Sequence, residues 1–252
     1  MSATDLRQIA AFRMSFARRQ AAEVTAIPGG AVVLDEEFAA SYEHNQLVIE
    51  GPTAPPDLVA LADAALGHLP HRQIAVLDDA LGVSLAPALT EAGYAHHPEL
   101  VMTHSGAAPA PGAAAEPVTL AELRSALLDQ QRRWLPDAAD EVIRQLADRR
   151  AARLRGAEQV RFLAVRDEEG EVASWADLYL DPARDIAQIE ELVTADHRTR
   201  RGYADTLLAT ALRQASGCGL FFLIAEPDDW PRAWYARRGF TPIGHAHRFS
   251  RT

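Results

Sequence analysis

Residues 186–204 read IAQIEELVTADHRTRRGYA, and this stretch decides the fold because it joins a strand to a helix. The apolar pattern predicts a strand over 186–194, and the apolar spacing that begins at Ala204 predicts a helix. Gly202 stands at the start of that helix, where unpaired amides and a partial positive charge attract anions. A small residue at this point lets an anion approach the amides, and Arg200 and Arg201 add positive charge. The stretch therefore predicts an anion site at a helix N-terminus.

The elements around this junction predict an α+β fold. Two helices come first, and the earlier one opens on a capping box of Thr119 and Glu122. Three strands then follow one another as antiparallel neighbours, because short turns separate their apolar runs. After the helix that begins near Gly202 come a strand buried on both faces, a short helix and a last strand. The expected strands are 160–166, 172–180, 186–194, 220–225 and one that starts near 241, and the short helix is 231–238.

Two motifs in this order resemble the GNAT superfamily of N-acyltransferases. Gly202 and Ala204 fit the Gly-x-Gly/Ala part of its acyl-CoA signature, whereas Thr199 stands where the family has Gln or Arg. The family also carries a tyrosine in its last helix, and residues 234–240, WYARRGF, supply Tyr235 in that place. The resemblance covers residues 117–252 in order. It implies a mixed, mostly antiparallel sheet flanked by helices, with acetyl-CoA as cosubstrate and no metal.

The resemblance also implies where acetyl-CoA would bind. Backbone amides near the end of the third meander strand would hold the thioester carbonyl, and the helix N-terminus would hold the pyrophosphate. Asp228 occupies a position where the family usually has Asn. The implied cofactor-binding residues are Leu192, Val193, Thr194, Thr199, Arg200, Arg201, Gly202, Tyr203, Ala204 and Asp228.

Catalysis by direct attack requires a base and an acid. An amine with a pKa near that of Lys, about 10.4, must lose a proton before its nitrogen attacks. Glu190 and Glu191 are the candidate bases, and neighbours on a regular strand point to opposite faces, so at most one faces the cleft. The ungapped family match favours Glu190, and a bulge would favour Glu191 instead. Tyr235 would protonate the departing thiolate.

The N-terminal half predicts a degenerate copy of the same fold. It shows strand, helix, strand, helix and strand in order, and Gly93-Tyr94 stands where Gly239-Phe240 stands in the second half. The loop 51–56 reads GPTAPP, and its prolines remove amide donors from the place where CoA would need them. Leu89 replaces the tyrosine. We therefore expect a degenerate GNAT-like domain at 1–104, an Ala/Pro/Gly-rich linker at 105–116 and a catalytic domain at 117–252; the alternative for the first half is an unrelated α/β domain.

Composition limits the partners. The net charge of −10 argues against nucleic-acid binding and is compatible with a cationic acceptor. The longest apolar runs are far shorter than a membrane span, and a single cysteine allows no intramolecular disulfide, so we expect a cytoplasmic chain. All 25 basic residues other than histidine are Arg, so we interpret Arg149-Arg150 and Arg237-Arg238 as solvated surface. The histidines at 96–97 and 245–247 lack metal-ligand spacing, and surface or pairing roles are expected.

These patterns favour acetyl transfer to a small-molecule or protein amine. The alternative is a non-catalytic acyl-CoA sensor of the same fold, because Thr199 departs from the signature. The motifs leave the acceptor amine, the length of the acyl chain and the oligomeric state open.

Overall fold

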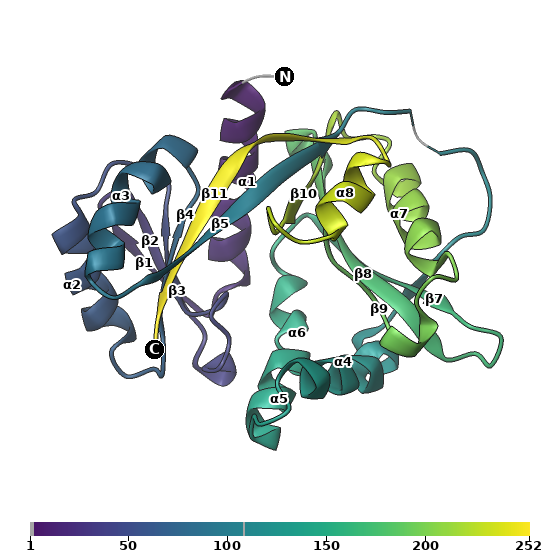
Figure 1. The fold of residues 1–252 in the computed structure, drawn as a ribbon, viewed down its shortest axis with the longest axis horizontal. Coiled ribbons are helices and arrows are strands. Elements are labelled where there is room, and N and C mark those ends of the chain that lie inside the picture. Colours follow the sequence, from purple (N-terminus) through teal and green to yellow (C-terminus); the bar gives the residue numbers. More distant parts are fainter. Residues whose placement is uncertain (1–2, 108) are drawn as a thin grey trace. The chain divides into compact units, whose positions relative to one another are not determined.

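The computed structural model describes residues 3–107 and 109–252, and its contacts divide the chain into two units (Figure 1). Unit 1 contains the residues up to Thr103 together with Ile224–Thr252, and unit 2 is His104–Leu223. The first boundary falls beside the one expected at 104–105. The residues from 224 onward, which the sequence predicts to belong to the second domain, instead belong to the same unit as the N-terminal residues.

Unit 1 is a six-stranded sheet in the order β1-β2-β3-β4-β11-β5. Its first three strands are antiparallel neighbours, β3 and β4 are parallel, and β11 runs antiparallel to β4 with His247 opposite Val76. The C-terminal strand therefore completes the sheet of the N-terminal half. The elements are α1 Ala3–Gln20, β1 Glu23–Ile27, β2 Gly30–Leu34, the 3₁₀ helix η1 Glu36–Phe38, β3 Gln46–Ile49, α2 Pro55–Leu66, β4 Arg72–Val76, α3 Asp79–Glu91, β5 Ala95–His104, α8 Pro231–Ala236 and β11 Phe240–Arg251.

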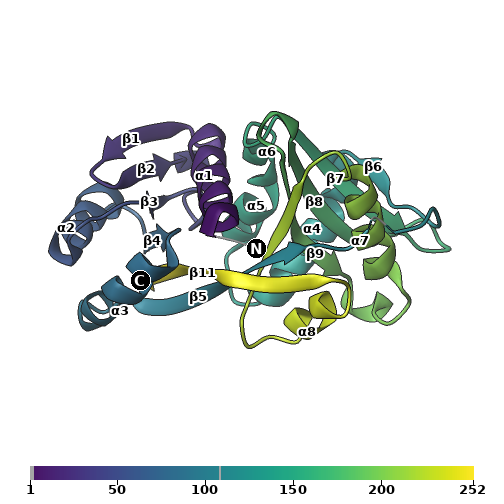
Figure 2. The same cartoon turned by 90° about the horizontal axis from the view of Figure 1, so that it is seen from above.

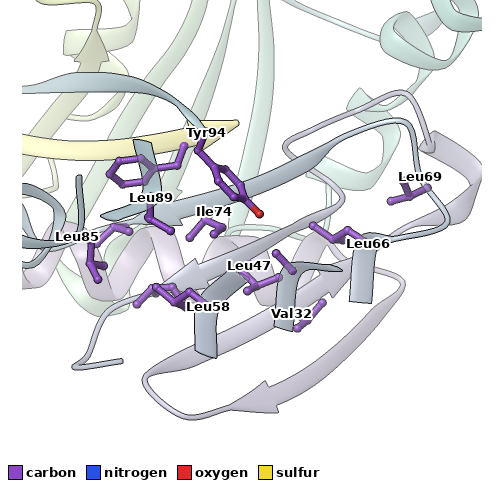
Figure 3. Close-up of a cluster of buried hydrophobic side chains, with 13 residues drawn as sticks. Val32, Leu47, Leu58, Leu66, Leu69, Ile74, Leu85, Leu89 and Tyr94 are labelled. Carbon is purple, nitrogen blue, oxygen red and sulfur yellow. The ribbon is translucent and has the colours of Figure 1, made fainter. Parts of the chain in front are cut away.

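One hydrophobic cluster lies in unit 1, between its helices and its sheet (Figure 3). Helices α2 and α3 bury Leu58 and Leu89 against strand residues such as Leu47 and Ile74. Phe249 of β11 belongs to the same cluster. Burial of apolar side chains is the main stabilising term in folding, so the last strand contributes to this core as well as to the sheet.

Unit 2 is a five-stranded sheet in the order β10-β9-β8-β7-β6. Neighbouring strands are antiparallel except β9 and β10, which are parallel and are joined by α7. The elements are β6 Glu116–Val118, α4 Leu120–Trp134, α5 Asp140–Asp148, α6 Arg150–Arg153, β7 Gln159–Arg166, β8 Val172–Asp181, η2 Pro182–Arg184, β9 Ile186–Thr194, η3 Asp196–Arg198, α7 Tyr203–Gln214 and β10 Leu220–Ala225.

The expected α+β fold is confirmed, and the two halves of the chain repeat one order of elements along the sequence (Figure 2). In each, a helical segment precedes three strands, and then helix, strand, helix and strand follow. The capping box at the start of α4 is also confirmed, since the Glu122 amide donates to Thr119 Oγ1 at 3.3 Å and the Thr119 amide donates to Glu122 Oε2 at 2.8 Å. The hairpin of β1 and β2 was not anticipated.

The expected linker 105–116 lies against α7 over part of its length, and its Ala108 is outside the described residues. The Ala115 amide donates to Thr210 Oγ1 at 2.9 Å, and Arg213 donates to the carbonyls of Ala110 and Ala113. The described part of 105–115 contains no helix or strand, and β6 begins at Glu116. None of the helices in the described ranges has the length and apolarity to cross a membrane.

Candidate acetyl-CoA site

The N-terminus of α7 has an open approach. Gly202 caps the helix with φ of +81°, in the left-handed region that favours glycine. A Cβ built at this glycine would meet no atom within 4 Å. The helix begins at Tyr203, so the first unpaired amides, including that of Ala204, follow directly. The residues present therefore fit a phosphate group at this helix end.

The arginines beside this glycine divide into two kinds. Arg198 is used inside the protein, because it pairs with Glu169 at 3.1 Å and with Asp167 in the turn between β7 and β8. Arg200 and Arg201 are exposed, and within 3–107 and 109–252 neither has an ion-pair partner. Thr199 turns its hydroxyl to the Asp196 carbonyl at 3.1 Å. The side chains of Arg200 and Arg201 thus provide two positive charges beside the N-terminus of α7.

Strand β9 carries a bulge shortly before the segment that connects it to α7. Val193 lies opposite Trp175 of β8 and Glu190 lies opposite Asp177, so both Glu191 and Leu192 face the single residue between them. Glu191 has φ of +47°, which is unusual for a residue other than glycine. A bulge leaves backbone groups outside the regular ladder. Here those groups lie on the segment expected to hold a thioester carbonyl.

A buried cluster of charged residues surrounds the bulge, and we call it the arginine latch: Arg149, Arg150, Arg153, Asp177 and Glu191. Arg153 donates to Asp177 Oδ2 at 2.7 Å and to Glu191 Oε1 at 2.8 Å. Arg150 contacts Glu191 and lies 3.3 Å from Asp177 Oδ1, and Arg149 donates to Glu191 at 3.1 Å. The side chains of Arg150 and Arg153 are only 2% and 1% exposed.

The interpretation of Arg149-Arg150 as solvated surface is therefore wrong for Arg150. Because Arg is so abundant in this chain, the sequence does not distinguish the latch arginines from surface arginines. Strand β8, however, contains a residue that indicates a buried partner of positive charge. Asp177 interrupts an apolar strand and is fully buried. A charge in such a position needs a partner of opposite sign. Of the other arginine pair, Arg238 stacks on the Trp234 ring at 3.8 Å and Arg237 is exposed.

The latch changes the ionisation of Glu191. Burial by itself would raise the pKa of this carboxyl, but the guanidinium groups of Arg150, Arg153 and Arg149 outweigh it and hold the pKa well below its usual range. Glu190 is half-buried and lies opposite Asp177 in the register, so it shares the face on which Asp177 meets the arginines. The bulge thus brings both glutamates toward one face, which strict strand alternation does not allow.

The segment after the bulge is fixed to β8. Ser174 donates to the Val193 carbonyl at 2.6 Å and also bonds Thr194 Oγ1 at 2.9 Å. The Ala195 amide donates to the Ala173 carbonyl at 2.9 Å. Leu192, Val193 and Thr194 therefore follow a defined path between the bulge and η3.

Tyr235 and Asp228 belong to unit 1, whereas the residues above belong to unit 2. Tyr235 lies on α8, between Trp234 and Phe240, whose ring centroids are 5.1 and 5.6 Å away. Burial raises the pKa of the Tyr235 phenol to about 12. Asp228 is exposed in the turn that precedes α8. Tyr235 is therefore protonated at neutral pH and able to donate a proton.

The end of the last helix has a close counterpart in the N-terminal half. Gly93 follows α3 with φ of +88°, and Gly239 follows α8 with φ of +87°. The next residues, Tyr94 and Phe240, are both buried. Leu89, which stands in place of Tyr235, is fully buried in the hydrophobic cluster. The turn of the repeat is retained in the N-terminal half, and the phenol is absent.

The loop between β3 and α2 is closed by the β1–β2 turn. Gly29 accepts hydrogen bonds from the amides of Glu50 and Gly51 at 2.9 and 3.0 Å. Thr53 donates to the Pro28 carbonyl at 3.0 Å, and a Cβ at Gly29 would clash with Thr53. The helix then starts with proline at its first positions. The amides of Glu50 and Gly51 are thus used in hydrogen bonds within the protein.

Three histidines of unit 1, His96, His245 and His247, form a network of paired side chains with Asp79. His96 Nε2 lies 2.9 Å from His247 Nδ1, and His247 Nε2 lies 3.1 Å from Asp79 Oδ1. His245 Nδ1 lies 3.5 Å from the same carboxylate. The described residues contain no group of three or more His, Cys, Asp or Glu arranged to hold a metal ion. The network connects β5, β11 and α3 within unit 1.

The fold is a tandem α+β arrangement, and the helix that begins at Tyr203 in its second half has an open N-terminus. Residues 120–240 match the family model described as Acetyltransferase (GNAT) family. This part of the chain is a GNAT acetyltransferase domain, and the N-terminal half repeats its order of elements. Family membership supports acyl-CoA-dependent acyltransfer in general.

Solved structures show the same fold over nearly the whole chain. A conserved protein of unknown function from Staphylococcus epidermidis is 12% identical, with a TM-score of 0.70 over 92% of this chain and 94% of its own. A GCN5-related N-acetyltransferase from Kribbella flavida is 18% identical, with a TM-score of 0.61 over 99% and 96%. A tandem GNAT protein from the clavulanic acid biosynthesis pathway is 16% identical, with a TM-score of 0.54 over 98% and 94%. No curated protein matches the sequence.

Proposed function

We propose that this chain transfers an acetyl group from acetyl-CoA to a primary amine by direct attack. The observation that carries the proposal is the open N-terminus of α7, where Gly202 leaves room for a phosphate beside Arg200 and Arg201, which form no ion pair within the described part of the chain. The pyrophosphate would accept from the amides that follow Gly202, and Arg200 and Arg201 would neutralise its charge. The bulge in β9 would place backbone amides of residues 192–194 beside the thioester carbonyl.

Glu190 is the better base of the two glutamates. Glu191 is bound by three guanidinium groups that hold its pKa well below its usual range, and such a carboxylate accepts a proton poorly. Glu190 lies on the same face with its side chain half-buried. Glu190 would take a proton from the ammonium form of the acceptor, directly or through a water, and free the nitrogen lone pair.

The rest of the reaction balances with Tyr235 as acid. The amine nitrogen forms a bond to the carbonyl carbon, the carbon–sulfur bond breaks, and the sulfur takes a proton from Tyr235. The nitrogen loses its second proton to solvent, and Tyr235 is reprotonated from solvent. A phenol with a pKa near 12 remains protonated through the neutral range, while a thiol has a pKa near 8.5. Proton transfer from the phenol to the thiolate is uphill by itself and is driven by collapse of the tetrahedral adduct.

Calorimetry with acetyl-CoA and a thiol-release assay with a panel of amines test the proposal. We expect one binding site per chain, because the loop between β3 and α2 is closed in the N-terminal half, and release of CoA thiol with some amines. Two equivalent sites would contradict the assignment of the N-terminal half as degenerate. No binding of acetyl-CoA would refute the proposed function itself.

A sensor of acyl-CoA is the second candidate. It is favoured by Thr199, whose hydroxyl bonds the Asp196 carbonyl and replaces the side chain that the family signature carries there. A sensor would bind acetyl-CoA at the same helix end and release no thiol with any amine. Tight binding without turnover across small amines and peptide lysines would favour it.

A further inference from the structure

The bulge in β9 holds a backbone conformation that its own residue does not favour. Glu191 adopts φ of +47°, where a side chain crowds the backbone. Such residues persist when the surrounding structure determines their conformation, and they gather at functional sites. Contacts with the surrounding residues must therefore hold Glu191 in this conformation.

The arginine latch encloses the bulge on the side where the register shifts. Arg150 and Arg153 each contact Asp177 on β8 and Glu191 on β9. Asp177 is the residue paired with Glu190, directly before the shift. The two guanidinium groups therefore bridge the two strands at the step where one extra residue enters β9. A slip of the bulge by one residue would move Glu191 away from both arginines.

Resting on the proposed function, we propose that Arg150, Arg153 and Asp177 are positioning residues that act through Glu191. They fix the bulge so that the amides of residues 192–194 are set to bind the acetyl carbonyl. The carboxylate of Glu191 serves to anchor the backbone and not to move protons, because it is surrounded by three guanidinium groups. The three arginines of the latch come from α6 and the residue before it, so this four-residue helix would help to position the bulge.

A matched pair of substitutions separates anchoring from chemistry. Both Glu191→Ala and Glu191→Gly remove the carboxylate. Alanine is still strained at φ of +47°, whereas glycine accepts this conformation readily. We expect the bulge to relax in Glu191→Ala and to persist in Glu191→Gly. Arg153→Met should behave like Glu191→Ala, because it removes the hydrogen bonds from Arg153 to Asp177 and Glu191.

The measurement is the ¹³C signal of acetyl-CoA labelled at the thioester carbonyl, together with the dissociation constants of acetyl-CoA and CoA. In the wild type, we expect a downfield shift on binding. In Glu191→Ala and Arg153→Met the shift should vanish, and the preference for acetyl-CoA over CoA should fall about 2- to 10-fold, the value of one hydrogen bond. Glu191→Gly should retain both. CoA, which lacks the carbonyl, should bind with unchanged affinity in every variant.

Controls distinguish this role from others. Arg124 pairs with Asp148 at 2.9 and 3.0 Å on the exposed side of α4 and α5, so Arg124→Gln removes an arginine bridge away from the bulge and should leave the carbonyl signal unchanged. An unchanged signal in folded Glu191→Ala would overturn the proposal. Equal loss in Glu191→Ala and Glu191→Gly would also overturn it, because the carboxylate would then act directly. Melting curves identify any variant that fails to fold, and failure of the wild type to bind CoA would count against the proposed function instead.

Discussion

Substitution of Gly202 tests the position of the phosphates most directly. A Cβ at this residue meets no atom within 4 Å, so a side chain is not excluded by its neighbours. The remaining cost is conformational, because φ of +81° is unfavourable for any other residue by about 1–2 kcal/mol. For a chain of this length that corresponds to a fall in melting temperature of about 2–8 °C. Gly202→Ala and Gly202→Glu should both fold and should share this loss.

The two variants should differ in CoA affinity. A carboxylate about 4 Å from a phosphate, at an effective dielectric constant near 20, is repelled by about 4 kcal/mol per unit charge. Partial exposure and salt reduce this value, so we expect Gly202→Glu to bind CoA about 10²- to 10³-fold more weakly than Gly202→Ala. Both variants carry the same backbone strain, so the ratio of their dissociation constants for CoA reports only the charge and size of the side chain.

Isothermal titration calorimetry with CoA measures the ratio. Gly170 offers a matched control, because it has φ of +85° and open space around its Cβ position in the turn between β7 and β8. Gly170→Glu should lose similar stability and keep its CoA affinity. The reasoning would be refuted by a folded Gly202→Glu that binds CoA within about fivefold of Gly202→Ala, since the phosphates would then lie elsewhere.

Three further predictions follow from single features. Tyr235→Phe should lower kcat by about 10²- to 10⁴-fold with a responsive amine and leave acetyl-CoA affinity unchanged; unaltered turnover would remove the phenol from the mechanism. Burial lowers the pKa of His71 and His96 in the folded chain, so the unfolded chain binds protons first and the free energy of unfolding should fall as pH drops below about 6.5. Thermal melts from pH 8 to 5 measure this, and His96→Gln should flatten the slope. Removal of residues 241–252 should expose Arg72–Val76 of β4 to amide hydrogen exchange; retained protection there would contradict the pairing with β11.

Local patterns predicted the elements around the site with good precision. Strands β9 and β10 have the bounds expected from the sequence, because each is a segment rich in strand-forming residues and has turn residues before and after it. The start of α7 was predicted for a similar reason, since Gly202 is needed where the backbone becomes left-handed. These features depend on residues close together in the chain, and such dependence is visible in a single sequence.

The arginine latch and the bulge could not be located in the same way. A bulge is one extra residue in a ladder, and its position depends on how β8 and β9 align, which two apolar strands do not specify. The three latch arginines lie close together in sequence but contact partners 24 to 42 residues away. The buried Asp177 was the one local sign that such partners exist, and it indicated neither how many there are nor where they lie.

The partner of β11 is the clearest case of information that local pattern lacks. The family match ends at Phe240, where β11 begins, and this strand then pairs with β4 of the N-terminal half. Helix α8, which carries Tyr235, precedes β11 and lies in the same unit. The half without an open cofactor loop therefore still supports the end of the acetyltransferase domain, because its sheet and its hydrophobic cluster hold the strand that follows Tyr235. The N-terminal half can therefore carry prolines and a closed turn in the loop between β3 and α2 while its core stays intact: the residues that hold β11 are those of the cluster, and substitutions in that loop do not touch them.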